Sequence, residues 1–123
     1  MRPGLTGHIE LTVEETDTAP SLGSGDVPVL GTPRIVALCE QAAIAALVGV
    51  LNGDDTTVGM RVQLDHLAPT AVGQSVSAEA TLEKVQGRRL TFTVSVSDSR
   101  GLVAAGRVTR VVVDRERFME KTL

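Results

Sequence analysis

Hydrophobic and polar residues alternate along the first patterned segment of the chain. In residues 5–13, LTGHIELTV, apolar residues and Gly7 take the odd positions and polar residues, His8 among them, the even ones. Successive side chains of a β-strand point to opposite faces of a sheet. The segment is therefore predicted to be a half-buried strand, with His8 on the solvent side.

The next pattern is apolar on nearly every side. Residues 31–53, GTPRIVALCEQAAIAALVGVLNG, begin with Thr32-Pro33, an N-cap hydroxyl followed by a proline, and end with Asn52-Gly53. These signals predict one helix on the order of 30 Å long. The Gly-, Pro- and Ser-rich loop before it, residues 18–31, is long enough to form a lid or a pocket wall.

A period of two returns after the helix and continues through four segments, residues 56–68, 74–85, 90–99 and 101–114. In the first, the even positions, which include Met60 and His66, are predicted to face the helix. In the last, the apolar phase shifts, which indicates a bulge or twist near Gly106. The short connections at 86–89 and 98–101 predict antiparallel neighbours.

These elements predict an α+β fold in which a curved antiparallel sheet wraps around one long central helix, as a single domain over residues 1–123. A helix that is apolar almost all round needs more cover than one sheet face supplies. A second copy of the chain would supply that cover, so we expect at least a homodimer, with a tetramer as the larger alternative.

Composition narrows the classes of partner. The chain has 42% hydrophobic and 22% charged residues, a net charge of −3, no Trp or Tyr and only two Phe. It therefore has neither a basic stripe nor a stacking platform, which argues against nucleic acid. No secretion signal is recognised, and residues 35–51 are too short and too interrupted for a membrane span. We expect a cytoplasmic protein, with Cys39 as a free buried thiol.

Two ionisable residues stand out against their apolar surroundings. Glu40 rises from an apolar helix stripe, where it either joins a solvated edge with Arg34 and Gln41 or has a purpose. His66 lies in the inward phase of its strand, where a hydrogen-bonded core histidine is the commoner case. Because the helix and that strand must pack together, a carboxylate in general-base range beside an imidazole is the functional alternative.

The chain resembles the hotdog-fold acyl-CoA thioesterases over about residues 28–118, and within them most closely the fluoroacetyl-CoA thioesterase group. That group has a threonine at the start of the hotdog helix, a glutamate eight positions later, a glycine in the next strand and a histidine before a proline-containing turn. Thr32, Glu40, Gly59 and His66 stand at these places. The hairpin segment VQGRRLTFTVSV, residues 85–96, adds to the similarity.

The resemblance implies hydrolysis of a small acyl-CoA thioester. No cofactor is expected, and no metal, because the only two histidines lie on different strands and in opposite phases and make a poor ligand set. It makes Glu40 the nucleophile or general base, with Thr32 and His66 assisting and the backbone N–H of Gly59 binding the oxyanion. A helix cap for Thr32 and a turn for Gly59 are the purely structural alternatives. The further candidates are Val29, Leu30 and Met60 for the acyl group, and Arg88 and Arg89, then Arg61, Arg107 and Arg110, for the phosphates of coenzyme A. Ordinary loop anchors and solvated strand ends are the structural alternatives for the loop residues and the arginines.

Thr32 and Glu40 are separated by eight helical residues, about 12 Å along the axis and roughly 80° around it. They reach one reacting atom only through water or in a site shared between two subunits. The loop before the helix also lacks the aromatic lid of the substrate-selective members, which argues against fluoroacetyl selectivity. A non-catalytic acyl-CoA binding or sensing module and a hotdog hydratase are the alternative functions.

Overall fold

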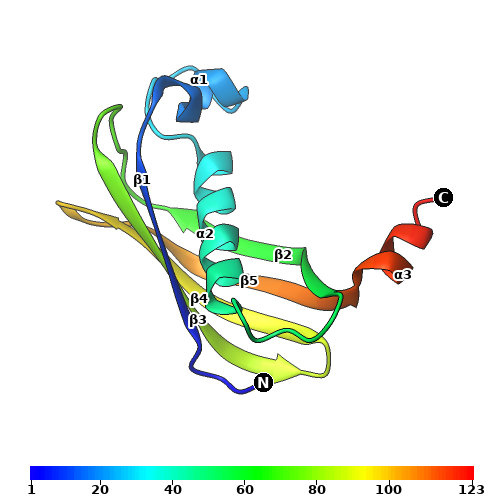
Figure 1. Ribbon diagram of the computed structural model, residues 1–123. Coiled ribbons are helices and arrows are strands. Elements are labelled where there is room, and N and C mark those ends of the chain that lie inside the picture. Colours follow the sequence, from blue (N-terminus) through cyan, green and yellow to red (C-terminus); the bar gives the residue numbers. More distant parts are fainter.

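The computed structural model describes residues 1–123 as one five-stranded antiparallel sheet curved around a helix (Figure 1). The strand order is β1-β3-β4-β5-β2, so β1 and β2 form the two edges. The elements are β1 (Thr6–Thr12), η1 (Glu15–Asp17), α1 (Ala19–Leu22), α2 (Thr32–Ala46), β2 (Asp55–His66), β3 (Ser75–Gln86), β4 (Arg89–Asp98), β5 (Gly101–Asp114) and α3 (Arg115–Glu120). The predicted arrangement of sheet and helix is confirmed. No helix is long and apolar enough to cross a membrane.

The central helix α2 is shorter than the sequence pattern predicts. It begins at Thr32, with Gly31 as the N-cap residue, and ends at Ala46. Residues 47–51 continue the apolar pattern but form turns, in which Gly49 has a φ of +76°. A residue with left-handed backbone does not continue a right-handed helix. Of the apolar side chains after Ala46, Leu47 is buried in the core and Val48 is exposed.

The core lies between α2 and the inner face of β3 and β4. The buried side of the helix consists of Ile35, Leu38, Cys39, Ala42, Ala43 and Ala46. Alternate residues of the two strands meet it, which confirms their predicted period of two: Val76, Ala78, Ala80 and Leu82 from β3, and Leu90, Phe92, Val94 and Val96 from β4. The small alanines let helix and sheet approach closely.

The edge strand β2 departs from the predicted pattern because it carries a bulge. Gly59 pairs with Arg110 and Arg61 pairs with Thr109, so Met60 is an extra residue between them. A bulge of one residue exchanges the faces of the strand on its two sides. Even positions therefore face the helix only after Met60. Met60 itself is the extra residue of the bulge and is exposed, so the predicted alternation does not run unbroken through it.

The predicted irregularity near Gly106 is also misplaced. Gly106 pairs with Leu64 in an unbroken stretch of β2–β5 register. The irregularity of β5 lies at Val103, which has no partner between Leu102 and Ala104 in the pairing with β4. The glycine at 106 has a different cause, since a Cβ there would run into the carbonyl oxygen of Gln63.

One apolar surface remains uncovered in the single chain. α2 packs mainly over β1, β3 and β4, so the side of the helix toward β2 has no second layer. Four apolar side chains are exposed here: Ile44 on α2, Val48 in the turn that follows it, and Met60 and Val62 on β2. The outer edge of β2 pairs with no strand. We call these four side chains the open apolar face.

Gly7 sets the distance between α2 and the edge strand β1. A Cβ at this position would collide with the carbonyl oxygen of Ala42 and the backbone nitrogen of Ala46, both in the helix. Backbone atoms of a packed helix cannot move aside cheaply. We therefore predict that Gly7→Ala lowers the free energy of unfolding by about 1–3 kcal/mol, measured by urea denaturation.

The neighbouring exposed residue supplies the control for this prediction. Thr6→Ala adds no atom and faces solvent, so it should change stability by less than about 0.5 kcal/mol. An equal effect of the two substitutions would contradict the close approach of β1 and α2.

Candidate active site

Glu40 and Arg110 form an ion pair between the middle of α2 and β5. The Nη1 atom of Arg110 lies 2.9 Å from Oε2 of Glu40. The arginine side chain is 7% exposed and the glutamate side chain 30% exposed. Arg110 Nε also donates to Thr57 Oγ1 (2.9 Å), and Nη2 donates to the Thr57 carbonyl oxygen (3.0 Å). These two bonds to β2 hold the guanidinium in a fixed position beside the carboxylate of Glu40.

Glu40 lies directly against the backbone of Gly59. A Cβ added to Gly59 would collide with Oε2 of Glu40 and would lie 3.6 Å from Nη1 of Arg110. Only glycine allows the carboxylate to approach this strand so closely. The carboxylate of Glu40, the guanidinium of Arg110 and the backbone of Gly59 therefore lie together.

The second group of candidate residues lies at the other end of β2. The hydroxyl of Thr32, in the first turn of α2, is 2.8 Å from Nδ1 of His66. The other ring nitrogen, Nε2, is buried and has no hydrogen-bond partner. Because Gly31 is the N-cap residue and its helix has no side-chain cap bond, the capping alternative for Thr32 is wrong.

The bulge at Met60 is what brings both groups to the helix side of the sheet. Gly59 and His66 are seven residues apart, so an unbroken strand would point them to opposite faces. With the extra residue, Gly59 shares a face with its partner Arg110, and His66 shares the same face with its buried partner Ala104. The irregularity is therefore part of the site.

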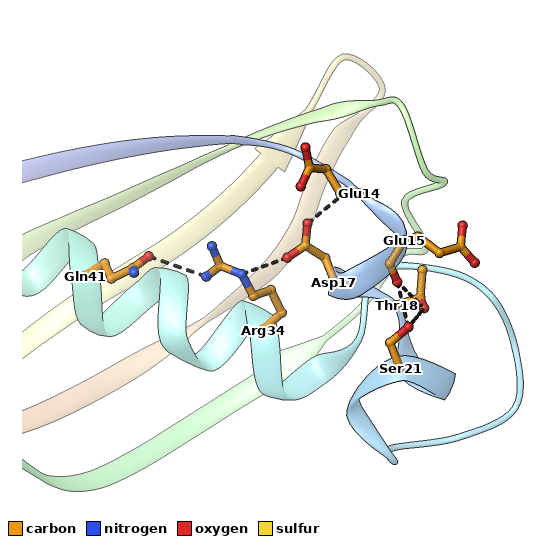
Figure 2. Close-up of polar contacts among 7 residues, drawn as sticks. All are labelled: Glu14, Glu15, Asp17, Thr18, Ser21, Arg34 and Gln41. Carbon is orange, nitrogen blue, oxygen red and sulfur yellow. Dashed lines mark hydrogen bonds and ion pairs between the residues drawn. The ribbon is translucent and has the colours of Figure 1, made fainter.

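The two groups do not meet within one chain. Thr32 and Glu40 stand about 12 Å apart along one helix, and each has its own partner, His66 and Arg110 respectively. The solvated-edge alternative for Glu40 is also wrong. Arg34 donates instead to Oε1 of Gln41, at 3.4 Å, a contact drawn in Figure 2, while Glu40 pairs with Arg110.

Two hollows accompany these groups. Val29 and His66 line an open hollow of about 230 Å³ together with Leu67, Ala68 and Pro69. An apolar hollow of about 190 Å³ lies one helical turn beyond Glu40, lined by Ile44, Leu47, Val48, Leu51, Thr56 and Thr57. Thr57 belongs both to this hollow and to the support of Arg110.

The remaining predicted binding residues lie elsewhere. Leu30 is part of the buried core, so it forms no open wall. Met60 is exposed next to Gly59. Arg88 and Arg89 are exposed at the turn between β3 and β4, where Arg88 donates to the carbonyl oxygen of Val112 (3.2 Å) and lines a surface pocket of about 400 Å³ with Arg117 and Lys121.

The role of Arg110 is the main feature that sequence reasoning missed. The sequence suggests it as a cation for the phosphates of coenzyme A, but Arg110 is buried and paired with Glu40. Burial lowers the pKa of Arg110, and Glu40 opposes that shift. The available signal was its position between Val108 and Val112 in the apolar phase of β5, where an arginine needs a buried anion.

The same environment affects the neighbouring cysteine. Burial raises the pKa of the Cys39 thiol to about 11, and the negative charge of Glu40 adds to the shift. A thiol of this kind stays protonated at neutral pH and is a poor nucleophile. Cys39 is therefore a packing residue, as predicted.

The family of the chain follows from its match to a family model. Residues 13–116 match the model described as fluoroacetyl-CoA-specific thioesterase, FlK. The chain belongs to this thioesterase family. A fluoroacetyl-CoA thioesterase from Streptantibioticus cattleyicolor is 32% identical over 93 residues, which span 76% of this chain and 67% of that protein.

Solved structures agree with the family. The fluoroacetyl-CoA thioesterase FlK superposes with a TM-score of 0.93 at 28% identity, over 99% of this chain and 95% of that one. A hot-dog-like protein from Thermanaerovibrio acidaminovorans matches in fold, with a TM-score of 0.90 at 24% identity over 99% and 90% of the two chains. The predicted hotdog fold is confirmed, as is the expected class of enzyme, an acyl-CoA thioesterase.

The pair of Glu40 and Arg110 should be energetically coupled. Glu40→Met leaves a nearly buried guanidinium without its anion, whereas the double replacement with Arg110→Met leaves two apolar side chains. We predict a coupling energy of about 1–3 kcal/mol in a double-mutant cycle of unfolding free energies.

The exposed pair of Arg115 and Asp54, 3.6 Å apart, is the control for this cycle. Solvent screens both partners, so its coupling should stay below about 1 kcal/mol. Additivity of the Glu40 and Arg110 substitutions within about 0.5 kcal/mol would contradict a tight pair.

Proposed function

We propose that the protein hydrolyses the thioester of a small acyl group with coenzyme A, and that Glu40 is its nucleophile or general base. The observation that supports this most is the carboxylate held between the Arg110 guanidinium and the bare backbone of Gly59. A group fixed in this way keeps one oxygen oriented by the arginine and can turn the other toward a reactant.

Two routes lead to the same products. As a base, Glu40 takes a proton from water, the water oxygen attacks the carbonyl carbon, and the carbon–sulfur bond breaks. As a nucleophile, the carboxylate displaces the thiolate to form a mixed anhydride, which water then hydrolyses. Either route consumes one water and yields a free acid and the thiol of coenzyme A.

Gly59 and His66 fit supporting roles in these routes. A backbone N–H at Gly59, close to Glu40, would stabilise the oxygen on which negative charge develops. Thr32 engages Nδ1 of His66, which leaves Nε2 for a water, a substrate atom or the departing sulfur. Thr32 thus acts by orienting the imidazole.

A homodimer would unite the two separated groups. Pairing two β2 edges antiparallel sets the half of one strand that carries His66 beside the half of the other that carries Gly59. It would also cover the open apolar face, which a single chain exposes. The site proposed here is therefore composite, with Glu40 from one subunit and Thr32 and His66 from the other.

The substrate contacts follow from this placement. In the composite site, Val29 lies beside His66 of one subunit and Met60 beside Gly59 of the other, so both can contact a small acyl group. Leu30 belongs to the buried core next to Val29 in the chain. Arg88 and Arg89 are proposed as cations for the phosphates of coenzyme A, because they are exposed and strongly basic. Acyl-CoA is the proposed partner, in the cytoplasm.

Thiol release from a panel of short, branched, aromatic and fluorinated acyl-CoA thioesters tests the proposed function. Glu40→Gln keeps an oxygen that accepts from Arg110 but leaves the guanidinium without its anion, so it should fold with reduced stability while kcat falls by about 10²–10⁴-fold. Glu79→Gln removes an exposed carboxylate of β3 and should leave kcat unchanged. Binding of the thioesters without release by the wild type would favour the non-catalytic module instead.

A further inference from the structure

Residues 14–31, which we call the cap segment, connect β1 to α2 and cover the N-terminal end of the helix (Figure 1). The segment contains η1 and the four-residue α1, and residues 20–28 within it are all exposed. A stretch with so little buried surface owes its position to a few specific contacts.

One carboxylate makes both an ion pair and a hydrogen bond among these contacts. Asp17 Oδ1 lies 3.0 Å from Nε of Arg34, in the first turn of α2, and Oδ2 accepts from the backbone N–H of Glu14 (2.8 Å), as Figure 2 shows. The side chains are 11% and 24% exposed. This is the one ion pair between the cap segment and α2.

Asp17 holds the helix on both sides of Thr32. Its carbonyl oxygen accepts from the N–H of Gly31 (2.9 Å), the residue before Thr32, and its carboxylate binds Arg34, two residues after Thr32. Its position in the segment therefore determines how the chain enters the helix at Thr32.

Asp17 is also linked, through the two residues that follow it, to Val29, which lies beside His66. Thr18, which follows Asp17, pairs with Leu30, and the N–H of Ala19 donates to the carbonyl oxygen of Val29 (2.9 Å). Val29 lines the hollow that contains His66. A shift of Asp17 would displace both the Thr32 hydroxyl and this wall.

We propose that Asp17 and Arg34 are positioning residues of the thioesterase site, which fix the Thr32 hydroxyl on Nδ1 of His66. The inference rests on the proposed function. Neither side chain contacts a reacting atom; both act through the backbone around Thr32. Losing one partner leaves the other charge unpaired in a mostly buried place, so the segment shifts rather than keeping its geometry.

The test compares Asp17→Asn, Arg34→Gln and the double variant in thiol release. Each single change should lower kcat about 10- to 100-fold, the effect of a displacement near 1 Å, with a smaller change in KM. The double variant removes both charges and leaves two amides that can bond each other, so it should recover most of the lost kcat. Glu15→Gln, on the same 3-10 helix and without a side-chain contact, is the control.

Amide hydrogen exchange gives a readout separate from turnover. The N–H groups of Ala19, Leu30 and Gly31 should exchange faster in the single variants and return toward wild type in the double one, while those of β4 stay protected. A lower Tm with unchanged kcat would overturn the inference and leave a structural ion pair. A double variant as slow as the singles would also overturn it.

The proposed function and the positioning role of Asp17 and Arg34 can be disproved separately. A wild type that releases no thiol removes the proposed function, and this inference with it. A wild type that releases thiol beside fully active Asp17 and Arg34 variants removes only the inference.

Discussion

The ion pair of Glu40 and Arg110 is the interaction on which the arrangement of this protein depends. A carboxylate in the middle of an apolar helix and a guanidinium in the apolar phase of a strand are each costly to bury alone. They are tolerated because each is the other's partner, at 2.9 Å. Helix α2 and strand β5 must therefore pack with Glu40 opposite Arg110, which sets their mutual position.

Several local features follow from this pairing. Thr57 has to offer both its hydroxyl and its carbonyl oxygen to the arginine. Gly59 has to lack a side chain, because the carboxylate occupies that space. Both residues face the helix side although they precede the bulge, and His66 faces the same side after it. Because of the bulge at Met60, Gly59, beside the buried ion pair, and His66, at the other end of β2, face the same side of the sheet.

The sequence was informative where one local pattern determines the outcome. Alternation in residues 74–85 and 90–99 predicted the strands correctly, and the Thr32-Pro33 signal placed the start of α2. The sequence was uninformative where the conformation of one segment depends on its contacts with another. The bulge depends on how β2 pairs with β5. The turns after Ala46 contain Gly49 in a left-handed conformation, which the continuing apolar pattern does not reveal. Glu40 and His66 could be singled out by their surroundings, but the partner of Glu40 lies 70 residues further along the chain.

The central claim is that Glu40 of one subunit acts together with His66 of another, and mixing two inactive variants tests it most directly. Glu40→Gln and His66→Ala subunits are unfolded together and refolded, and thiol release is measured beside each variant alone. If the site is shared, each mixed dimer contains one intact site, and random pairing in a twofold dimer restores about a quarter of wild-type activity. A mixture that forms mixed dimers by mass yet stays as inactive as its components would contradict the account.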